Sequence, residues 1–380
     1  MAIALTGLLL ILTFGSLAFY LACALLTWRF FRRSPEAISN LEMPPVSLMV
    51  PVCGLDAGAW ENWLSLCCQD YPDYEILFGV KDADDPAVPL LEKLVATFPE
   101  RVRLYIDLPA RGSNYKDSNL SYLLEAAQHE MIIFADSDIR VRPDYLRIAI
   151  APLADPQVGL VTCAFTGRNP QSLGSALAYC GRCIDFIPSA LIARALDGGL
   201  RFAVGVTLAT RQTTLAAAGG LHLSRIGSDY NLGKRIAQAG YRVELSPYVL
   251  DWDTGDEGVA AVYQRELRWA RTIRYNRGPI YYTMIFCYGS LASLLLLPVS
   301  GWASWAIALS LLTWVGRYLQ AWVAIYYLDS QKLLPWLWAL PFRDLLSLAI
   351  WAVGSYGRRV RWRGRWLRVE GDGLIRRWET

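Results

Sequence analysis

The chain has 380 residues, of which 54% are hydrophobic, and its formal net charge is only +3. So small a net charge excludes a protein that binds nucleic acid through its overall charge, and we expect no nucleic-acid partner. The apolar composition, with 15 Trp, is high for a water-soluble enzyme. Cys180-x-x-Cys183 has no second pair and no nearby His, so we expect buried thiols rather than a zinc site. His129 and His222 have no catalytic neighbourhood and are expected to be structural.

The first long apolar stretch runs from Ala2 to Trp28 and carries no charge. It is long enough to span a bilayer, which needs about 20 residues. No basic residue precedes it, and basic residues follow it, namely Arg29, Arg32 and Arg33. We therefore interpret 1–28 as an uncleaved transmembrane anchor rather than a signal peptide, with its C-terminal side in the cytoplasm.

A second apolar block covers 280–356, followed by a basic tail at 357–380 that we expect to be cytoplasmic. Ile280–Val299 and Trp302–Leu328 each predict a membrane span, whereas Leu333–Tyr356 contains two prolines and the charged residues Arg343 and Asp344. Prolines indicate a broken or re-entrant helix, which would let this segment enter and leave on one side. Charged residues at membrane depth are costly unless they face protein or water, so Arg343 and Asp344 are candidate functional residues.

Between the membrane segments, 43–256 alternates strand-like and helix-like patterns. We expect strands at Val46–Val52, Tyr74–Val80, Val102–Asp107, Met131–Asp138, Val158–Phe165 and Arg201–Leu208. Helices are expected at Ala59–Cys68, Val88–Phe98, Ser118–Ala127, Tyr145–Ala151 and Ile226–Ala239. This alternation predicts an α/β domain with a mainly parallel, twisted sheet covered on both faces. Glycine-rich dinucleotide and P-loop motifs are missing from the sequence, which argues against those two classes of nucleotide-binding enzyme.

Two predicted strands end in acidic residues, Asp82, Asp84 and Asp85 after one and Asp136 and Asp138 after the other. The carboxyl ends of parallel strands meet at one edge of a sheet, where ligands bind. Two carboxylates so close together are unfavourable unless a cation joins them, and Mg²⁺ or Mn²⁺ takes such oxygen ligands together with substrate phosphates. The pattern therefore predicts a divalent cation on a diphosphate at Asp136 and Asp138. Taken alone, the pair is equally well explained as a polar turn.

Three further residues are candidates for substrate contacts or chemistry. Lys116 could neutralise a phosphate and Asn119 could hydrogen-bond a base or ribose, although alone they fit a solvated loop and a helix start. Asp229 opens a predicted helix and could act as a general base. The alternative is that Ser228 or Asp229 caps this helix.

The segment 257–279 predicts an amphipathic helix at the membrane interface, with arginines at every third position from Arg265. A period of three slips against the helical 3.6, so the row winds around the helix. We expect Arg265 and Arg268 to face the active site and the later arginines to face anionic lipid headgroups. A purely interfacial basic helix would explain the later arginines equally well.

Five motifs occur in an order similar to that of membrane-bound family 2-like glycosyltransferases with a GT-A fold. They are Asp84-Asp85-Pro86, Lys116-x-x-Asn119-Leu120, Asp136-Ser137-Asp138-Ile139-Arg140-Val141, Ser228-Asp229-Tyr230 and Arg265-x-x-Arg268-Trp269. More narrowly, the chain resembles the ceramide glucosyltransferases, family 21, and the hopanoid-pathway glycosyltransferases related to them. The resemblance covers nearly the whole chain and implies a GT-A catalytic domain with one N-terminal and about three C-terminal membrane segments.

The resemblance also implies roles for individual residues. The nucleotide-sugar site would comprise Pro51, Asp82, Asp84, Asp85, Lys116, Asn119 and Asp136. Asp136 and Asp138 would hold the divalent cation, Mn²⁺ or Mg²⁺, and Asp229 would be the base. Arg265, Arg268 and Trp269 would close on the diphosphate and the acceptor.

Two departures from the animal enzymes bear on the substrate. The animal ceramide glucosyltransferases resemble Asp-Ser-Gly where this chain has Asp138, and they carry a His in the region of 179–190, where this chain has none. The chain is more similar to the bacterial hopanoid-type enzymes in Asp138, and also in Gly112-Ser113-Asn114, Leu160-Val161-Thr162-Cys163 and the segment Glu266–Arg274. This similarity implies an inner-membrane protein with its catalytic domain in the cytoplasm.

The resulting prediction is an inverting transfer of a hexose from UDP-glucose or UDP-GlcNAc to the hydroxyl of a membrane lipid. Ceramide and a hydroxylated hopanoid are the expected acceptors, and the product would be a β-glycolipid. Two alternatives stay open: transfer to a polyprenyl phosphate, and a catalytically inactive membrane scaffold that binds nucleotide. A transporter is disfavoured because so few predicted spans could not enclose a path.

Overall fold

The computed structural model describes residues 2–32, 43–252 and 255–377. Some predicted positions lie outside the described residues: Met1 of the anchor, the flank residue Arg33, 253–254 of the catalytic domain and 378–380 of the tail. The chain forms two compact units. The helical unit comprises Met1–Ser34, Thr166–Ala193 and Asp256–Leu367, and the sheet unit comprises Pro35–Phe165, Arg194–Gly255 and Arg368–Thr380. Thr166–Ala193, which falls inside the predicted 43–256 region, thus groups with the helices.

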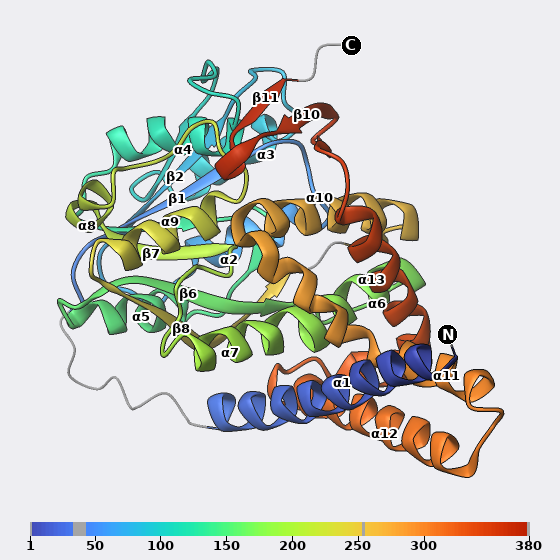
Figure 1. The fold of residues 1–380 in the computed structure, drawn as a ribbon. Helices are drawn as coiled ribbons and strands as arrows, with labels where there is room; N and C mark the ends of the chain where they lie inside the picture. The colour runs from blue at the N-terminus through green and yellow to red at the C-terminus, as the bar shows by residue number, and fades with distance from the viewer. Residues whose placement is uncertain (1, 33–42, 253–254, 378–380) are drawn as a thin grey trace. The chain divides into compact units, whose positions relative to one another are not determined.

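An eight-stranded sheet with the order β3-β2-β1-β4-β7-β6-β8-β5 forms the centre of the sheet unit (Figure 1). Its strands are β1 (Val46–Val52), β2 (Tyr74–Val80), β3 (Val102–Tyr105), β4 (Met131–Ala135), β5 (Ile139–Arg140), β6 (Val158–Thr166), β7 (Thr207–Arg211) and β8 (Arg242–Trp252). β3, β2, β1 and β4 pair in parallel, whereas β7 pairs antiparallel to both β4 and β6, and β5 pairs antiparallel to β8. The α/β class is confirmed, and the sheet is mixed rather than mainly parallel.

The strands predicted from continuous apolar runs are buried over nearly their whole length, as expected for strands covered on both faces. The strand predicted at Arg201–Leu208 is the exception, because only its last two residues are extended and β7 begins at Thr207. Gly205 and Val206 have φ angles of +96° and +54°, which end any extended conformation there. A β-branched residue in the left-handed region is strained. This bend is held by the Asp136 N–H, which donates to the Val206 carbonyl at 2.9 Å.

Helices on the sheet unit begin close to the predicted positions. They are α2 (Ala59–Cys67), α3 (Val88–Thr97), α4 (Tyr115–Ala126), α5 (Tyr145–Ile150) and α9 (Ser228–Gln238). A further short helix of this unit, α8 (Gln212–Ala217), was not predicted. α4 packs on β1 and β2, and α9 packs on β8. α4 begins three residues before its predicted start because Asn114 caps it, its side-chain oxygen accepting from the Lys116 and Asp117 N–H groups at 3.1 and 3.2 Å. Lys116 therefore lies in the first helical turn and not in a loop.

Within its described residues, the helical unit contains one π-helix and several 3₁₀ segments between its α-helices. Its elements are α1 (Ala2–Phe31), α6 (Leu173–Cys180), the π-helix η2 (Gly181–Phe186), α7 (Ile187–Leu196), α10 (Val259–Arg277), η3 (Gly278–Tyr288), α11 (Gly289–Val299), α12 (Ser304–Tyr327), η4 (Gln331–Ala339) and α13 (Leu340–Gly354). The strand β9 (Arg359–Trp362) and the start of β10 (Arg365–Val369) follow in this unit, whereas the end of β10 and β11 (Ile375–Arg377) belong to the sheet unit. α1 lies against α11 and α12 (Figure 1).

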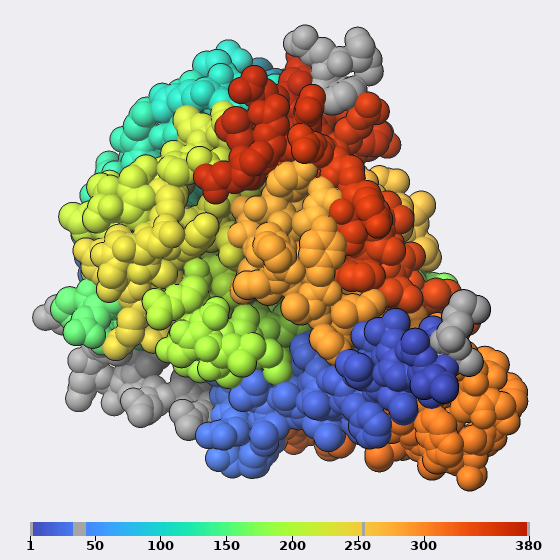
Figure 2. Space-filling view, in the orientation of Figure 1, coloured from blue at the N-terminus to red at the C-terminus, as the bar shows by residue number. Residues whose placement is uncertain are grey.

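Four helices of the described residues are long and apolar enough to cross a membrane: Ile3–Phe31, Leu173–Leu196, Val259–Val299 and Gln331–Gly354. The predicted span at Trp302–Leu328 does form a helix, α12, which is not among these four and which buries Arg317 and Gln320. The outer side of α1, blue in Figure 2, exposes a row of large apolar side chains that includes Ile3, Ile11 and Phe14. Exposed apolar rows of this kind are typical of surfaces that contact lipid.

Candidate active site

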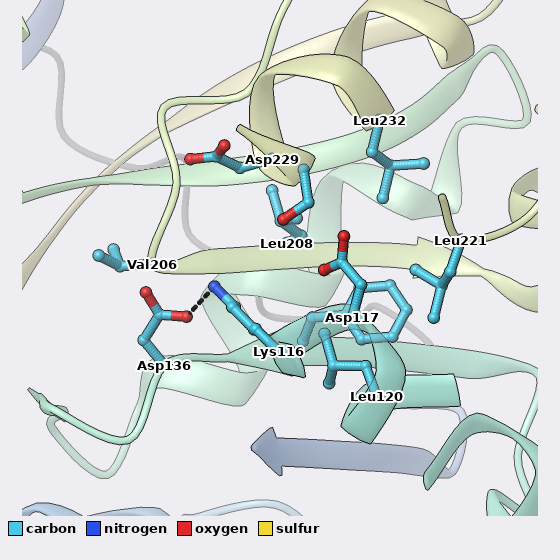
Figure 3. A pocket seen from close by; sticks show the side chains of 11 residues that line it. Lys116, Asp117, Leu120, Asp136, Val206, Leu208, Leu221, Asp229 and Leu232 are labelled. Carbon is cyan, nitrogen blue, oxygen red and sulfur yellow. Dashed lines mark hydrogen bonds and ion pairs between the residues drawn. The ribbon is translucent and has the colours of Figure 1, made fainter. Parts of the chain in front are cut away.

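A pocket in the sheet unit is lined by charged side chains from three distant parts of the sequence (Figure 3). Lys116 and Asp117 come from the first turn of α4, Asp136 from the end of β4, and Asp229 from the first turn of α9. The rest of the wall is largely apolar, with Leu120, Phe134, Val206, Leu208, Leu221 and Leu232 beside Ser228. The structure therefore brings together three predicted site residues, Lys116, Asp136 and Asp229, and adds Asp117.

The starts of α4 and α9 are tied together by the segments that precede them. The Asn114 N–H donates to the Leu223 carbonyl at 2.9 Å, and the Asn114 side-chain amide donates to the Arg225 carbonyl at 2.8 Å. A Cβ at Gly112 would collide with the Leu223 carbonyl, so the close approach of the two segments depends on glycine there. These contacts hold Lys116 and Asp229 at one pocket.

Lys116 and Asp136 form an ion pair, and about a third of each side chain is exposed, 31% and 29%. Burial lowers the pKa of the Lys116 ammonium, but Asp136 first, and then Asp229 and Asp117, outweigh it, so this pKa lies above its usual value. Lys116 is thus a permanent positive charge among three carboxylates. A fixed cation beside a strand-end pocket is suited to neutralise a phosphate.

Asp117 is a buried carboxyl that the sequence interpretation missed. Burial raises the pKa of Asp117 to about 7, while Lys116 and a hydrogen bond from Ser228 lower it and the Asp229 and Asp136 charges raise it further. The Asn114 side-chain amide donates to Asp117 at 2.8 Å. The available signal was the cap itself, because Asn114 at a helix start places position 117 in the first turn of α4, next to Lys116.

Asp229 presents its two oxygens to different groups. One accepts the Tyr230 N–H at 2.8 Å, and a Cβ placed on Gly205 would lie only 2.5 Å from the other. Gly227 occupies the N-cap position of α9, so Asp229 is not the N-cap residue, and its carboxylate satisfies only one N–H of the first turn. Burial raises the pKa of the Asp229 carboxyl, and Lys116 opposes this rise. A carboxylate with a raised pKa is a stronger proton acceptor, as a general base requires.

The two predicted metal ligands have different surroundings. Asp136 lines the pocket, whereas Asp138 accepts a hydrogen bond from the Trp252 indole N–H at 3.0 Å and is not part of the pocket wall. Nowhere in the described residues do three or more His, Cys, Asp or Glu side chains form a metal-holding group. One or two carboxylates suit a Mg²⁺-type ion that is otherwise bound by substrate phosphates and water. The donors present therefore fit a cation that arrives with a diphosphate.

The other predicted nucleotide-site residues lie near the ends of β1 and β2. Asp85 accepts the Gly54 N–H at 2.8 Å and the Ala87 N–H at 2.9 Å, so it joins the turns that follow the two strands. Asp82 pairs with its neighbour Lys81, and Asp84 is exposed. Pro51 lies opposite Gly79 in the β1–β2 register, and buried Asn119 donates to the Gly79 carbonyl at 2.7 Å. None of these residues lines the pocket of Figure 3, and their contact with a nucleotide stays a prediction.

In the helical unit, three guanidinium groups surround the Trp269 ring. Their distances to the ring centroid are 3.5 Å for Arg182, 5.2 Å for Arg265 and 5.8 Å for Arg268. Arg265 also forms an ion pair with Glu257. Arg182 lies in the π-helix η2 and was not predicted as a site residue, because a sequence pattern does not indicate a π-helix.

The later arginines of α10 make contacts that the lipid-headgroup prediction did not include. Arg271 donates to the backbone carbonyls of Tyr356 and Arg359, and Arg274 donates to that of Gly357. These contacts anchor the segment that follows α13.

Arg343 and Asp344 are buried and each finds partners on other helices. Arg343 contacts Glu266 at 2.8 Å and Asp185 at 3.2 Å, and Asp344 contacts Arg317 at 2.5 Å. Asp185 also contacts Arg317, at 2.8 Å, so the four pairs form one continuous chain of charges. Complete pairing of this kind is what makes charges tolerable at membrane depth, and it gives both predicted residues a structural role.

Comparison with solved structures defines the class of fold. The chain resembles a mannosyltransferase from Pyrobaculum calidifontis, solved in complex with GDP-Man and Mn²⁺, with a TM-score of 0.55 and 22% sequence identity over 93% of this chain and 98% of that chain. The fold is therefore of the GT-A glycosyltransferase type.

Comparison with protein families is more specific. The model of glycosyl transferase family 21 matches residues 8–375, so the chain belongs to this family. Two curated relatives from Caenorhabditis elegans are ceramide glucosyltransferase 3, 23% identical over 65% of this chain and 54% of that protein, and ceramide glucosyltransferase 1, 22% identical over 60% and 50%. The chain spans about half the length of these curated relatives.

Proposed function

We propose that the protein transfers a hexose from a UDP-sugar, UDP-glucose or UDP-GlcNAc, to the hydroxyl of a membrane lipid such as ceramide or a hydroxylated hopanoid. The observation that carries this proposal is the pocket in which a lysine and three carboxylates from α4, β4 and α9 meet. Membership of family 21, the relatives named ceramide glucosyltransferases and the apolar outer surface of α1 support a lipid acceptor.

In the proposed reaction the acceptor oxygen attacks the anomeric carbon of the donor in a single displacement. A bond forms between that oxygen and the carbon, the bond from the carbon to the diphosphate oxygen breaks, and Asp229 takes the hydroxyl proton. One attack inverts the configuration, so an α-linked donor yields a β-glycolipid. The raised pKa of the Asp229 carboxyl supports this role, because a raised pKa makes the carboxylate a stronger proton acceptor.

The leaving UDP carries the charge that develops in the transition state. Lys116 lies at the pocket and supplies one fixed positive charge to it. Asp136, with Asp138, would hold a divalent cation, Mn²⁺ or Mg²⁺, which when bound would neutralise the diphosphate further. Arg265, Arg268 and Trp269 are proposed to contact the diphosphate and the acceptor.

We place the sheet unit on the cytoplasmic face of a bacterial-type inner membrane. This orientation is supported, by the positive-inside rule, by Arg29 in the last turn of α1, by Arg32 just after it, and by the arginine-rich segment from Arg358 to Arg368. The resemblance of the sequence to the bacterial hopanoid-type enzymes is the support for proposing the inner membrane.

A product analysis tests the proposal. The purified protein in lipid nanodiscs is incubated with UDP-glucose or UDP-GlcNAc and, in separate reactions, ceramide, a hydroxylated hopanoid, diacylglycerol or a polyprenyl phosphate, and products are identified by mass. We expect a hexosyl lipid from a hydroxyl acceptor together with release of UDP. A glycosylated polyprenyl phosphate as sole product would refute the acceptor class, and no product and no UDP release with any pair would refute the activity.

A further inference from the structure

The C-terminal segment Gly371–Ile375 docks on the loop that leads into α9. The Ile226 N–H donates to the Gly373 carbonyl at 2.8 Å, and the Ile375 N–H donates to the Ser224 carbonyl at 2.9 Å. Between these two bonds, Arg225 and Leu374 form an antiparallel bridge. The Arg225 guanidinium closes the contact by binding both the carboxylate and the carbonyl of Asp372.

The docked segment has a defined conformation of its own. Asp372 and Gly373 have φ angles of +57° and +74°, and the Glu370 N–H donates to the Leu374 carbonyl at 2.8 Å across this turn. Only 1% of the Ile375 side chain is exposed. The predicted basic tail at 357–380 thus contains an ordered, partly buried turn that contacts the rest of the sheet unit.

The loop that receives this segment is the one that assembles the pocket. On one side, Leu223 and Arg225 offer their carbonyls to Asn114, the cap of α4. On the other side lies Gly371–Ile375. The loop therefore lies between the C-terminal segment and the start of α4, and Asp229 follows it directly in the first turn of α9.

We propose that Gly371–Ile375 is a positioning element of the active site, with Arg225 and Asp372 as positioning residues that keep Asp229 and Lys116 at one pocket. The effect on turnover rests on the proposed function, in which Asp229 and Lys116 act on the substrates. The effect on the Leu223–Ser228 backbone does not depend on that function.

Three changes of graded severity test the element in the full-length membrane protein: Asp372→Asn, the charge exchange Arg225→Asp with Asp372→Arg, and a chain that ends at Glu370. The Arg147–Asp70 pair, 2.8 Å apart, supplies the matched control Asp70→Asn. Its side chains are 35% and 72% exposed, compared with 27% and 69% for Arg225 and Asp372. Exposed pairs contribute little to stability, so neither single substitution should prevent folding.

We expect the shortened chain to lower kcat about 100-fold, the loss that a displacement of the base by about 1 Å can cause. Asp372→Asn should lower kcat by less, because the bond from Arg225 to the carbonyl of residue 372 remains. The KM for the donor and the melting temperature of Asp372→Asn should match those of Asp70→Asn. The charge exchange should keep kcat above that of the shortened chain without reaching the wild-type value, because a carboxylate at position 225 cannot donate to the carbonyl of residue 372. Unchanged kcat in the shortened chain, or an equal loss in Asp70→Asn, would overturn the proposal.

Hydrogen–deuterium exchange read by mass spectrometry separates this proposal from the proposed function. If the wild type transfers no sugar, the proposed function fails, while the positioning element still predicts faster exchange across Leu223–Ser228 in Asp372→Asn and in the shortened chain. Exchange at Leu223–Ser228 that is the same in these variants as in Asp70→Asn would overturn the element whether or not the protein is active.

Discussion

The contact between Gly205 and Asp229 provides a direct test of the geometry of the proposed base. A Cβ at position 205 would lie 2.5 Å from an Asp229 carboxylate oxygen, whereas ordinary van der Waals contact begins at 3.4 Å. In Gly205→Ala the carboxylate must therefore retreat by about 0.9 Å, the difference between these two distances. A displacement of about 1 Å can cost on the order of 100-fold in rate.

Gly240 offers a closely matched control for the backbone effect of this substitution. Its φ of +93° is close to the +96° of Gly205, but a Cβ there would meet nothing within 4 Å. Both alanine variants bear the strain of a left-handed backbone, roughly 1–2 kcal/mol, so their melting temperatures should fall by similar amounts. Only Gly205→Ala displaces Asp229.

Initial rates at saturating acceptor and varied UDP-sugar separate the two variants. We expect kcat of Gly205→Ala to fall about 100-fold with a nearly unchanged KM for the donor, because the base and not the donor site is displaced. Gly240→Ala should keep kcat within about 3-fold of the wild type, since it alters no contact at the pocket. Equal kcat values for the two variants would refute the placement of Asp229 as the base.

Three further substitutions test the charged side chains of the pocket and of the buried network in the helical unit. Lys116→Met should raise the KM for the donor. It should also move the acidic limb of the pH–rate profile to higher pH, because Lys116 opposes the rise in the pKa of Asp229. An acidic limb at the same pH as in the wild type would contradict the interaction between Lys116 and Asp229. Asp117 has a pKa of about 7 in the folded state and about 3.9 when unfolded, so the folded state binds more protons between these values and stability falls as pH rises through them. Asp117→Asn should remove that fall and raise the melting temperature at pH 8 relative to the wild type, and an equal pH dependence would contradict a buried carboxyl there. Arg343→Met leaves Asp185 and Glu266 without this partner and should destabilise the protein by about 3–5 kcal/mol, measured by thermal unfolding in detergent, and a change below about 1 kcal/mol would contradict the buried network.

Local sequence patterns were sufficient for much of the sheet unit. Apolar runs between turn residues placed β1, β2 and β6 correctly, because a strand buried on both faces needs little information beyond its own composition. The apolar run at Arg201–Leu208 misled for the same reason, since composition does not reveal the positive φ angles of Gly205 and Val206.

Residues of the site could be predicted only where the residue type and its place at the end of a strand or the start of a helix already indicated the chemistry. Asp136 at a strand end and Asp229 at a helix start were predicted, and the pocket contains both. Asp117 was missed because it becomes a site residue only when the α4 cap brings it beside Asp229. The pairing of Arg343 with Glu266 joins residues that are far apart in the sequence, so no local pattern could indicate it.

The π-helix η2 shows the same limit in the helical unit. Leu173–Leu196 is apolar enough to cross a membrane, yet it was not predicted as a separate helix, and its central Arg182 and Asp185 suggest a polar segment in the sequence. Their charges are compatible with an apolar helix because Asp185 contacts Arg317 and Arg343, and Arg182 packs on Trp269. Such compensation depends on tertiary structure.

The central claim, that Asp229 removes the proton of the acceptor hydroxyl, is tested most directly by Asp229→Asn. This substitution keeps the shape of the side chain and removes its ability to take a proton, so UDP-sugar binding measured by calorimetry should be unchanged. The kcat for lipid glycosylation should fall by about 10²–10⁴-fold, the range that general-base catalysis contributes. Glycolipid formation within about 3-fold of the wild type, with the donor bound equally well, would contradict the mechanism.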